Sequence, residues 1–303
     1  MRRAPVLAAA LVAWACDREP NRPLPAESTR ASAPSAALSE PVPPAPAPVV
    51  LQRDVACRAL RVRGEARTED GAALVERAVL DGGTWLTLSN EARVVVVHAR
   101  SGREVTLVGP GRFLPCRGGT EQFLVAEGTL EGAAGTGVRP GAEVWIATPF
   151  GTLRYGDAAL TAEVQEKDLR VTIERGALAA ELAPGVQGFP AKGLTGPNGR
   201  AVLTSAPDAA GLVAACETAA REAHESAARV LAARSGPPRG SEAGKHLVLR
   251  RRARSLCASA AASVARVADP AARSRLGDQL DRADGLWQTI ARAPVPDPSG
   301  SAR

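Results

Sequence analysis

Two hydrophobic periodicities divide the chain after residue 50. The first is a set of short alternating or β-branched runs, separated by glycine and proline, which predicts strands of four to eight residues. The third and fourth of these runs are expected to stop at Gly109-Pro110-Gly111 and at Glu127-Gly128. The expected strands are Trp85–Leu88, Arg93–Arg100, Glu104–Val108, Gln122–Ala126, Glu143–Thr148, Leu160–Val164, Leu169–Ile173 and Ala177–Leu182. The pattern indicates an all-β sandwich or coiled sheet over residues 55–183, with parallel and antiparallel pairing left open.

The second periodicity begins after residue 205, where apolar residues recur every three or four positions. It predicts two or three helices, with a break at Ser235–Gly240 and a helix start at Asp269-Pro270. The apolar positions of the three helices are Leu212, Cys216, Ala219, Ala223, Ala227 and Val230; Leu249, Ala253, Leu256, Ala260, Val264 and Val267; and Leu276, Leu280, Ala283, Trp287 and Ile290. The predicted fold class is therefore multi-domain α+β: a β domain, a connector at 184–205, a helical module at 206–293 and a loose tail at 294–303.

The N-terminus has the form of an export signal. Two arginines precede a short apolar run, Ala4–Ala15, which is too short to cross about 30 Å of hydrocarbon. Ala15-Cys16 resembles a lipobox, which would make Cys16 a lipidation site; cleavage after Ala13-Trp14-Ala15 is the alternative. Residues 17–50 are rich in Pro, Ala and Ser and are expected to form an extended disordered linker. We therefore expect an exported protein on the periplasmic side of a membrane.

Four cysteines remain when Cys16 is set aside, and an even number in an exported chain favours disulfides. The simplest of three connectivities pairs Cys57 with Cys116 in the β region and Cys216 with Cys257 in the helical region. Buried free thiols are the alternative. The chain has no Cys-x-x-Cys and its three histidines are scattered, so no metal or other cofactor is expected.

The charge pattern offers one dense feature on a modest background. The net charge is +6 over 303 residues and aromatic residues make up 3%, which does not favour a nucleic-acid partner. Arg250, Arg251 and Arg254 are expected to share a face of the second helix, opposite its apolar stripe. That face is either simply solvated or contacts an anionic envelope polymer or lipid headgroups.

Catalytic chemistry has little support in the sequence. His98, His224 and His246 stand in no recognisable nucleophile motif, and no phosphate-binding loop occurs. His98 is expected to be a packing or surface residue of a strand. We expect no enzyme and no small-molecule substrate.

Three segments of the β region carry a family pattern: Gly102–Phe113, Ala147–Asp157 and Val171–Leu178. Their most specific part is Thr148-Pro149-x-Gly151 followed by Gly156, residues that suit a strand end and unusual backbone angles. Over roughly 100 residues the chain resembles the FecR domain.

The resemblance implies an envelope-facing domain in signalling or protein–protein contact. Sigma-regulating members carry a cytoplasmic helical module and a transmembrane helix that this sequence does not show, and Gly156-Asp157 departs from the usual Gly-Thr. We therefore expect a non-catalytic envelope protein that binds or senses a protein or polymer. The alternatives are a periplasmic regulator in a sigma-factor system and a hydrolase of cell-wall polymer.

Overall fold

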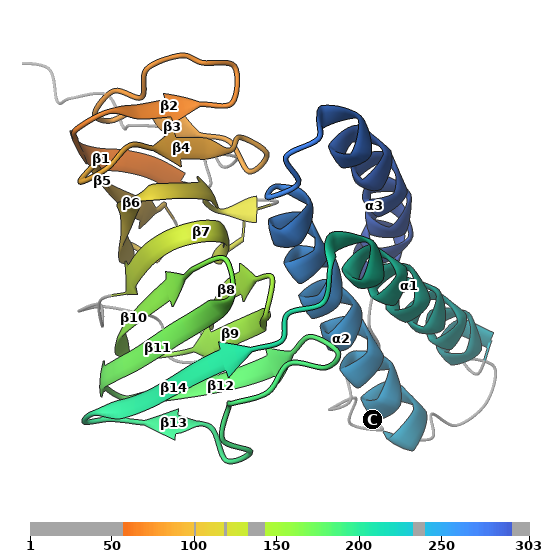
Figure 1. Ribbon diagram of the computed structural model, residues 1–303. Coiled ribbons are helices and arrows are strands. Elements are labelled where there is room, and N and C mark those ends of the chain that lie inside the picture. Colours follow the sequence, from red (N-terminus) through yellow and green to blue (C-terminus); the bar gives the residue numbers. More distant parts are fainter. Residues whose placement is uncertain (1–56, 100, 118–119, 133–142, 233–239, 293–303) are drawn as a thin grey trace, which may run out of the picture. The chain divides into compact units, whose positions relative to one another are not determined.

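A computed structural model describes residues 57–99, 101–117, 120–132, 143–232 and 240–292 (Figure 1). The expected export signal with Cys16, the linker and the C-terminal tail lie outside these residues. So do the side chains of Trp287 and Ile290.

The described strands form one sheet in which every pairing is antiparallel except the parallel pair β7–β8. The strands are β1 (Cys57–Arg63), β2 (Ala66–Thr68), β3 (Val79–Leu80), β4 (Leu86–Leu88), β5 (Arg93–His98), β6 (Glu104–Leu114), β7 (Gln122–Gly132), β8 (Val144–Thr148), β9 (Gly151–Tyr155), β10 (Ala159–Val164), β11 (Asp168–Arg175), β12 (Ala177–Leu182), β13 (Leu194–Thr195) and β14 (Gly199–Thr204). The main path runs β13-β12-β9-β8-β7-β6-β5-β1-β3.

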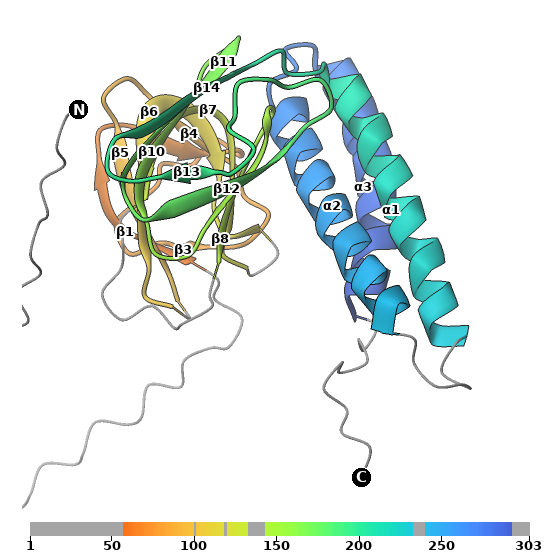
Figure 2. The same cartoon turned by 90° about the horizontal axis from the view of Figure 1, so that it is seen from below.

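The sheet forks at its two longest strands. The first half of β6 pairs with β5 and its second half with β4. The first half of β7 pairs with β8 and its second half with β10, which continues to β11 and β14. Because each long strand changes partner along its length, the branches curl around a common core, as the end-on view in Figure 2 shows. That core is built mainly of Val, Leu, Ile and Phe.

The expected strand ends at Gly109–Gly111 and at Glu127-Gly128 are wrong. β6 runs through the first and β7 through the second, with register shifts between the two strands at this level. Proline has no N–H to donate and glycine adopts angles closed to other residues, so these positions bend a strand without ending it.

Three helices follow the strands: α1 (Ala209–Ala232), α2 (Gly240–Val264) and α3 (Pro270–Arg292). The predicted start of the third helix is confirmed. The Asp269 carboxylate accepts hydrogen bonds from the backbone N–H groups of Ala271 and Ala272, and Pro270 takes the first helical position. Val267 lies beyond the end of α2.

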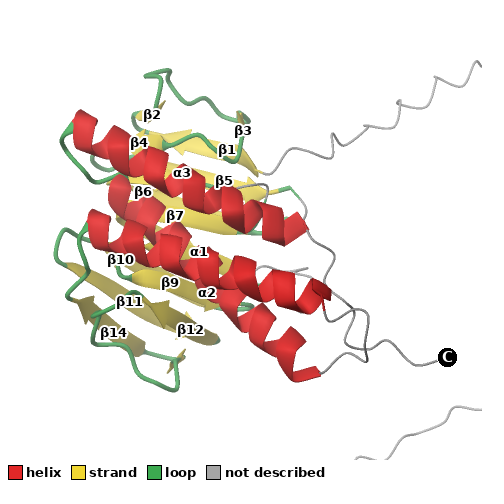
Figure 3. Cartoon of the chain, turned by 90° about the vertical axis from the view of Figure 1, so that its right-hand side faces the viewer, coloured by secondary structure: helices red, strands yellow, loops and turns green. Residues whose placement is uncertain are grey.

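Strands and helices belong to one compact unit, Leu51–Arg303. Helix α2 packs its small residues Ala258 and Ala262 against Leu114, Leu124 and Ala147 of the sheet, and Figure 3 shows the helices covering this side of the strands. The structure is therefore mixed α+β. The Ala-rich face of α2 permits this close packing on the sheet. The division into a β domain and a helical module stays a prediction.

The segment 184–205, expected to be a connector, instead contains β13 and β14. β14 pairs with β11 along its whole length, from Asp168↔Thr204 to Ile173↔Gly199. The Gly and Pro residues of the segment 184–205 lie mainly in the turns around these strands. Composition alone therefore gave no indication of β14.

The structure pairs the cysteines as the simplest connectivity predicts. Cys57 bonds Cys116 within the β region, with Cα atoms 6.0 Å apart, and Cys216 bonds Cys257 between α1 and α2, with Cα atoms 4.6 Å apart. All four are fully buried. Two disulfides indicate a protein that folds in an oxidising compartment outside the cytosol.

Candidate functional site

A cleft of about 380 Å³ lies where α2 and α3 meet the sheet. Its size falls within the ordinary range of ligand sites. One wall comes from the sheet and its loops, and the other from the end of α2 and one face of α3. The lining residues are Glu69, Gly82, Gly83, Trp85, Arg112, Leu114, Arg117, Leu124, Ala261, Val264, Ala265, Arg273, Gly277, Leu280, Asp281 and Asp284.

Arg112 of β6 joins the two walls. One guanidinium nitrogen donates to the Ala265 carbonyl oxygen at 2.8 Å and the other to Glu69 Oε1 at 2.7 Å. The Ala265 carbonyl stands just beyond the C-terminal end of α2, where carbonyls lack helical partners and a cation is favoured. The guanidinium also lies over the Trp85 ring, 5.3 Å from its centre. Arg112 thus fixes both the position of α2 and the orientation of the aromatic wall.

A second link crosses the cleft from Arg117 to Asp284 of α3. The two side chains form an ion pair, and each is mostly buried. Burial raises the pKa of Asp284, and the attraction of Arg117 opposes part of that increase. The second carboxylate oxygen, Oδ1, is buried and has no hydrogen-bond partner among the residues that the structure describes. The cleft therefore has a partly desolvated, polar floor.

Not all charged side chains in the cleft are used in such links. Arg273 and Asp281, both on α3, form no side-chain hydrogen bond or ion pair with any residue that the structure describes. They are the groups of this site that remain available to a ligand.

Arg254 does not lie on a free face of α2, and this part of the predicted arginine face is wrong. Its guanidinium lies 4.2 Å from the centre of the Trp145 ring and donates to Thr120 Oγ1 at 3.3 Å. Arg154 lies over the same ring at 5.5 Å. Burial, and then the nearby charge of Arg117, lowers the pKa of Arg254. The side chain anchors α2 to the sheet, because α2 turns this position toward β8.

The other two arginines of the predicted face lie toward the N-terminal half of α2. Arg251 is exposed and Arg250 is half-buried. Arg251 also lines a smaller hollow of about 300 Å³ with Arg154, Glu181, Leu247 and Val248. Burial raises the pKa of Glu181 despite the arginines around it. The exposed part of the predicted basic face is thus smaller than the sequence suggested.

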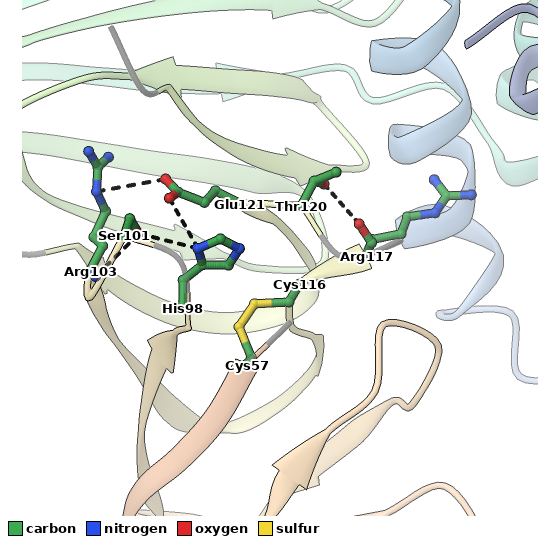
Figure 4. The surroundings of a disulfide bond; sticks show 8 residues. All are labelled: Cys57, His98, Ser101, Arg103, Cys116, Arg117, Thr120 and Glu121. Carbon is green, nitrogen blue, oxygen red and sulfur yellow. Dashed lines mark hydrogen bonds and ion pairs between the residues drawn. A yellow bond between two sulfur atoms is a disulfide. The ribbon is translucent and has the colours of Figure 1, made fainter. Parts of the chain in front are cut away.

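His98 belongs to a buried polar cluster beside the Cys57–Cys116 bond (Figure 4). Its Nδ1 lies 3.1 Å from Glu121 Oε1 and 3.2 Å from Ser101 Oγ. Glu121 and Ser101 both contact Nδ1 of His98. A nucleophile–histidine–acid relay requires the acid on one ring nitrogen and the nucleophile on the other. Burial acts to raise the pKa of Glu121, but the hydrogen bonds from His98 and Ser101, together with electrostatic attraction to His98 and Arg103, outweigh it, and the pKa is lowered. The cluster is structural in its geometry.

The Thr148–Gly151 segment forms the tight connection between β8 and β9. The Thr148 hydroxyl donates to the Gly151 carbonyl at 3.0 Å and accepts from the Phe150 N–H at 3.2 Å. Gly151 has φ +133°, and a Cβ there would lie 2.5 Å from the Glu181 carbonyl oxygen. Thr148, Pro149 and Gly151 therefore serve the turn itself, whereas Gly156 lies in an exposed bend after β9.

The sequence prediction missed the cleft. Trp85, Arg112 and Asp284 come from three segments up to about 200 residues apart, so no local motif announces them. One signal was available: Arg112, near the end of β6, and Arg117, just after it, flank the buried residues Leu114 and Cys116, and a charge beside buried residues requires a partner.

Comparison with known proteins found no matching family model, and a search of curated proteins found no match either. The FecR resemblance therefore remains a prediction. Among the described helices, none is long and apolar enough to cross a bilayer.

Proposed function

We propose that this chain is a non-catalytic envelope protein that binds a protein or polymer partner in the cleft between Trp85 and α3, with a sensing or scaffolding output. A lipid on Cys16 and the 17–50 linker would hold the folded unit away from the membrane. The proposal keeps the FecR-like domain as its fold-family expectation.

The observation that carries the proposal is the construction of the cleft. Its walls are tied together by Arg112 and by the Arg117–Asp284 pair, while Arg273, Asp281 and part of Trp85 remain accessible. A rigid site with a few unused polar groups and an aromatic surface is typical of recognition. The two disulfides support it: one fixes the segment that carries Arg117, the other joins α1 to α2, and both fit an oxidising environment.

A hydrolase of cell-wall polymer is the second candidate, and one observation favours it. Carboxylates stand on both walls of the cleft, Glu69 on one and Asp284 on the other, and burial raises the pKa of Asp284 as a general acid requires. Both, however, are held in ion pairs, Glu69 with Arg112 and Asp284 with Arg117. Glu69→Gln and Asp284→Asn variants on a cell-wall substrate test it: hydrolysis lost in both would replace the binding proposal.

Site-specific photo-cross-linking in intact envelopes tests the binding proposal. A photoreactive residue replaces Arg273 or Asp281, inside the cleft. Matched controls replace Arg275 or Asp278, which are exposed on the same helix and do not line the cleft. We expect one discrete adduct from the cleft positions that Trp85→Ala weakens. Equal labelling from the control positions, or none from any position, would reject the cleft as the binding site.

A regulator in a sigma-factor system is a narrower form of the same proposal. It predicts that the adduct contains a membrane-spanning protein. An adduct with a polysaccharide or with no protein partner would exclude it.

A further inference from the structure

The face that α3 turns to the cleft has a regular charge pattern. Five residues of α3 line the cleft at steps of four, three, one and three residues, which places them on one side of the helix: Arg273, Gly277, Leu280, Asp281 and Asp284. Asp284 is already paired with Arg117. The cation that remains unused stands near the start of α3, and the unused carboxylate stands two turns further along.

The distance between these two charges is set by the helix. Eight residues separate Arg273 from Asp281, and at 1.5 Å per residue their positions lie about 12 Å apart along the axis. An extended peptide advances about 3.3–3.6 Å per residue, so three to four residues span the same length.

Gly277 leaves the wall between the two charges open. It lies midway, and a Cβ at that position would meet no atom of the described residues within 4 Å. Trp85 and Leu124 line the cleft from the sheet side, and Leu280 adds to the apolar lining. An extended chain with small side chains could lie along this gap with its backbone against the aromatic surface.

The orientation of the ligand follows from electrostatics. Arg273 lies in the first turn of α3, where the helix dipole is positive, so this end favours a carboxylate. Asp281 favours an ammonium group at the other end. A simple anion would use only Arg273, and a neutral sugar would use neither charge.

We infer that the cleft binds a short extended peptide of three to four residues through its free carboxylate at Arg273 and its free amino group at Asp281. The inference rests on the proposed function, because it names the chemistry of the ligand that the cleft would bind.

An NMR titration of the oxidised mature protein with tetra-alanine tests the inference. We expect saturable binding that shifts the Trp85 indole signal. Acetylating the peptide amino group should weaken binding about tenfold or more in the parent protein and have little effect in Asp281→Asn. Amidating the peptide carboxylate should likewise weaken binding about tenfold or more in the parent protein, and it should have little effect in Arg273→Gln.

The controls are Arg275→Gln and Asp278→Asn, which should bind tetra-alanine like the parent protein. Equal affinity for the free and the blocked peptides, or no saturable binding of tetra-alanine, would overturn the inference. If cross-linking from the cleft positions persists in that case, the proposed function stands and only the peptide chemistry fails. Loss of both results would reject both.

Discussion

Removing the Cys216–Cys257 bond should cost this protein much of its stability. The bond joins α1 to α2 across an interface of small residues, in which Ala219, Ala223, Ala227, Ala253 and Leu256 form the buried cluster. Alanine removes little apolar area from water, so the interface has a small hydrophobic contribution per residue. A covalent link matters more in such an interface than in one made of leucine and phenylalanine.

The magnitude follows from the loop that the bond closes. The two cysteines are 41 residues apart. In the chain-entropy model, a loop of that length restricts the unfolded chain by about 4 kcal/mol at 25 °C. Domains of ordinary stability unfold with about 5–15 kcal/mol, so the loss would be a large fraction of the total.

Urea denaturation followed by far-UV circular dichroism measures this loss in the variant Cys216→Ala/Cys257→Ala, with the Cys57–Cys116 bond intact. The free energy of unfolding should fall nearly as much in each single variant as in the double variant, because either change breaks the same bond. A loss below about 1 kcal/mol in the double variant, or single losses that add up, would refute the reasoning.

Three further predictions concern single residues. Gly151→Ala should lower the free energy of unfolding by about 2 kcal/mol or more, because φ is +133° and the new Cβ would lie 2.5 Å from the Glu181 carbonyl oxygen. Gly277→Ala, whose Cβ would meet no described atom within 4 Å, should instead raise it by up to about 1 kcal/mol through helix propensity. Urea denaturation compares the two variants. Arg254→Ala removes the contacts to Trp145 and Thr120 and should lower the free energy of unfolding by about 2 kcal/mol. Arg252 is exposed, so Arg252→Ala should change that free energy by no more than about 0.5 kcal/mol in the same assay. The lowered pKa of Glu121 means that its stabilisation is present above the ordinary value of 4.5 and is lost as pH falls through the lower folded-state value. Glu121→Gln should therefore flatten this part of the curve of melting temperature against pH, and an unchanged slope would contradict the assignment.

Local pattern determined many elements of this fold and several of their ends, but not β1, β9 or β14. The alternation of Leu160–Val164 and the Asp269-Pro270 start were readable because strand and helix periods, and the capping of N–H groups, depend on residues within one or two turns. Cysteine count and region likewise favoured the pairing of Cys216 with Cys257 that the structure contains. Where an element continues through its breakers, as β6 does past Pro110, the local pattern was insufficient because neighbouring strands supplied the missing pairings.

Only the tertiary structure decided which charged side chains are buried or paired and which are exposed. The sequence placed Arg254 with Arg250 and Arg251, but the packing of α2 on β8 buried it against Trp145. The cleft exists because the segment after β6 meets α3 in space: its Arg117 pairs with Asp284 of α3, 167 positions further along the chain. A contact over that separation depends on how the whole sheet forks and how the helices return to it, and no local periodicity encodes that arrangement.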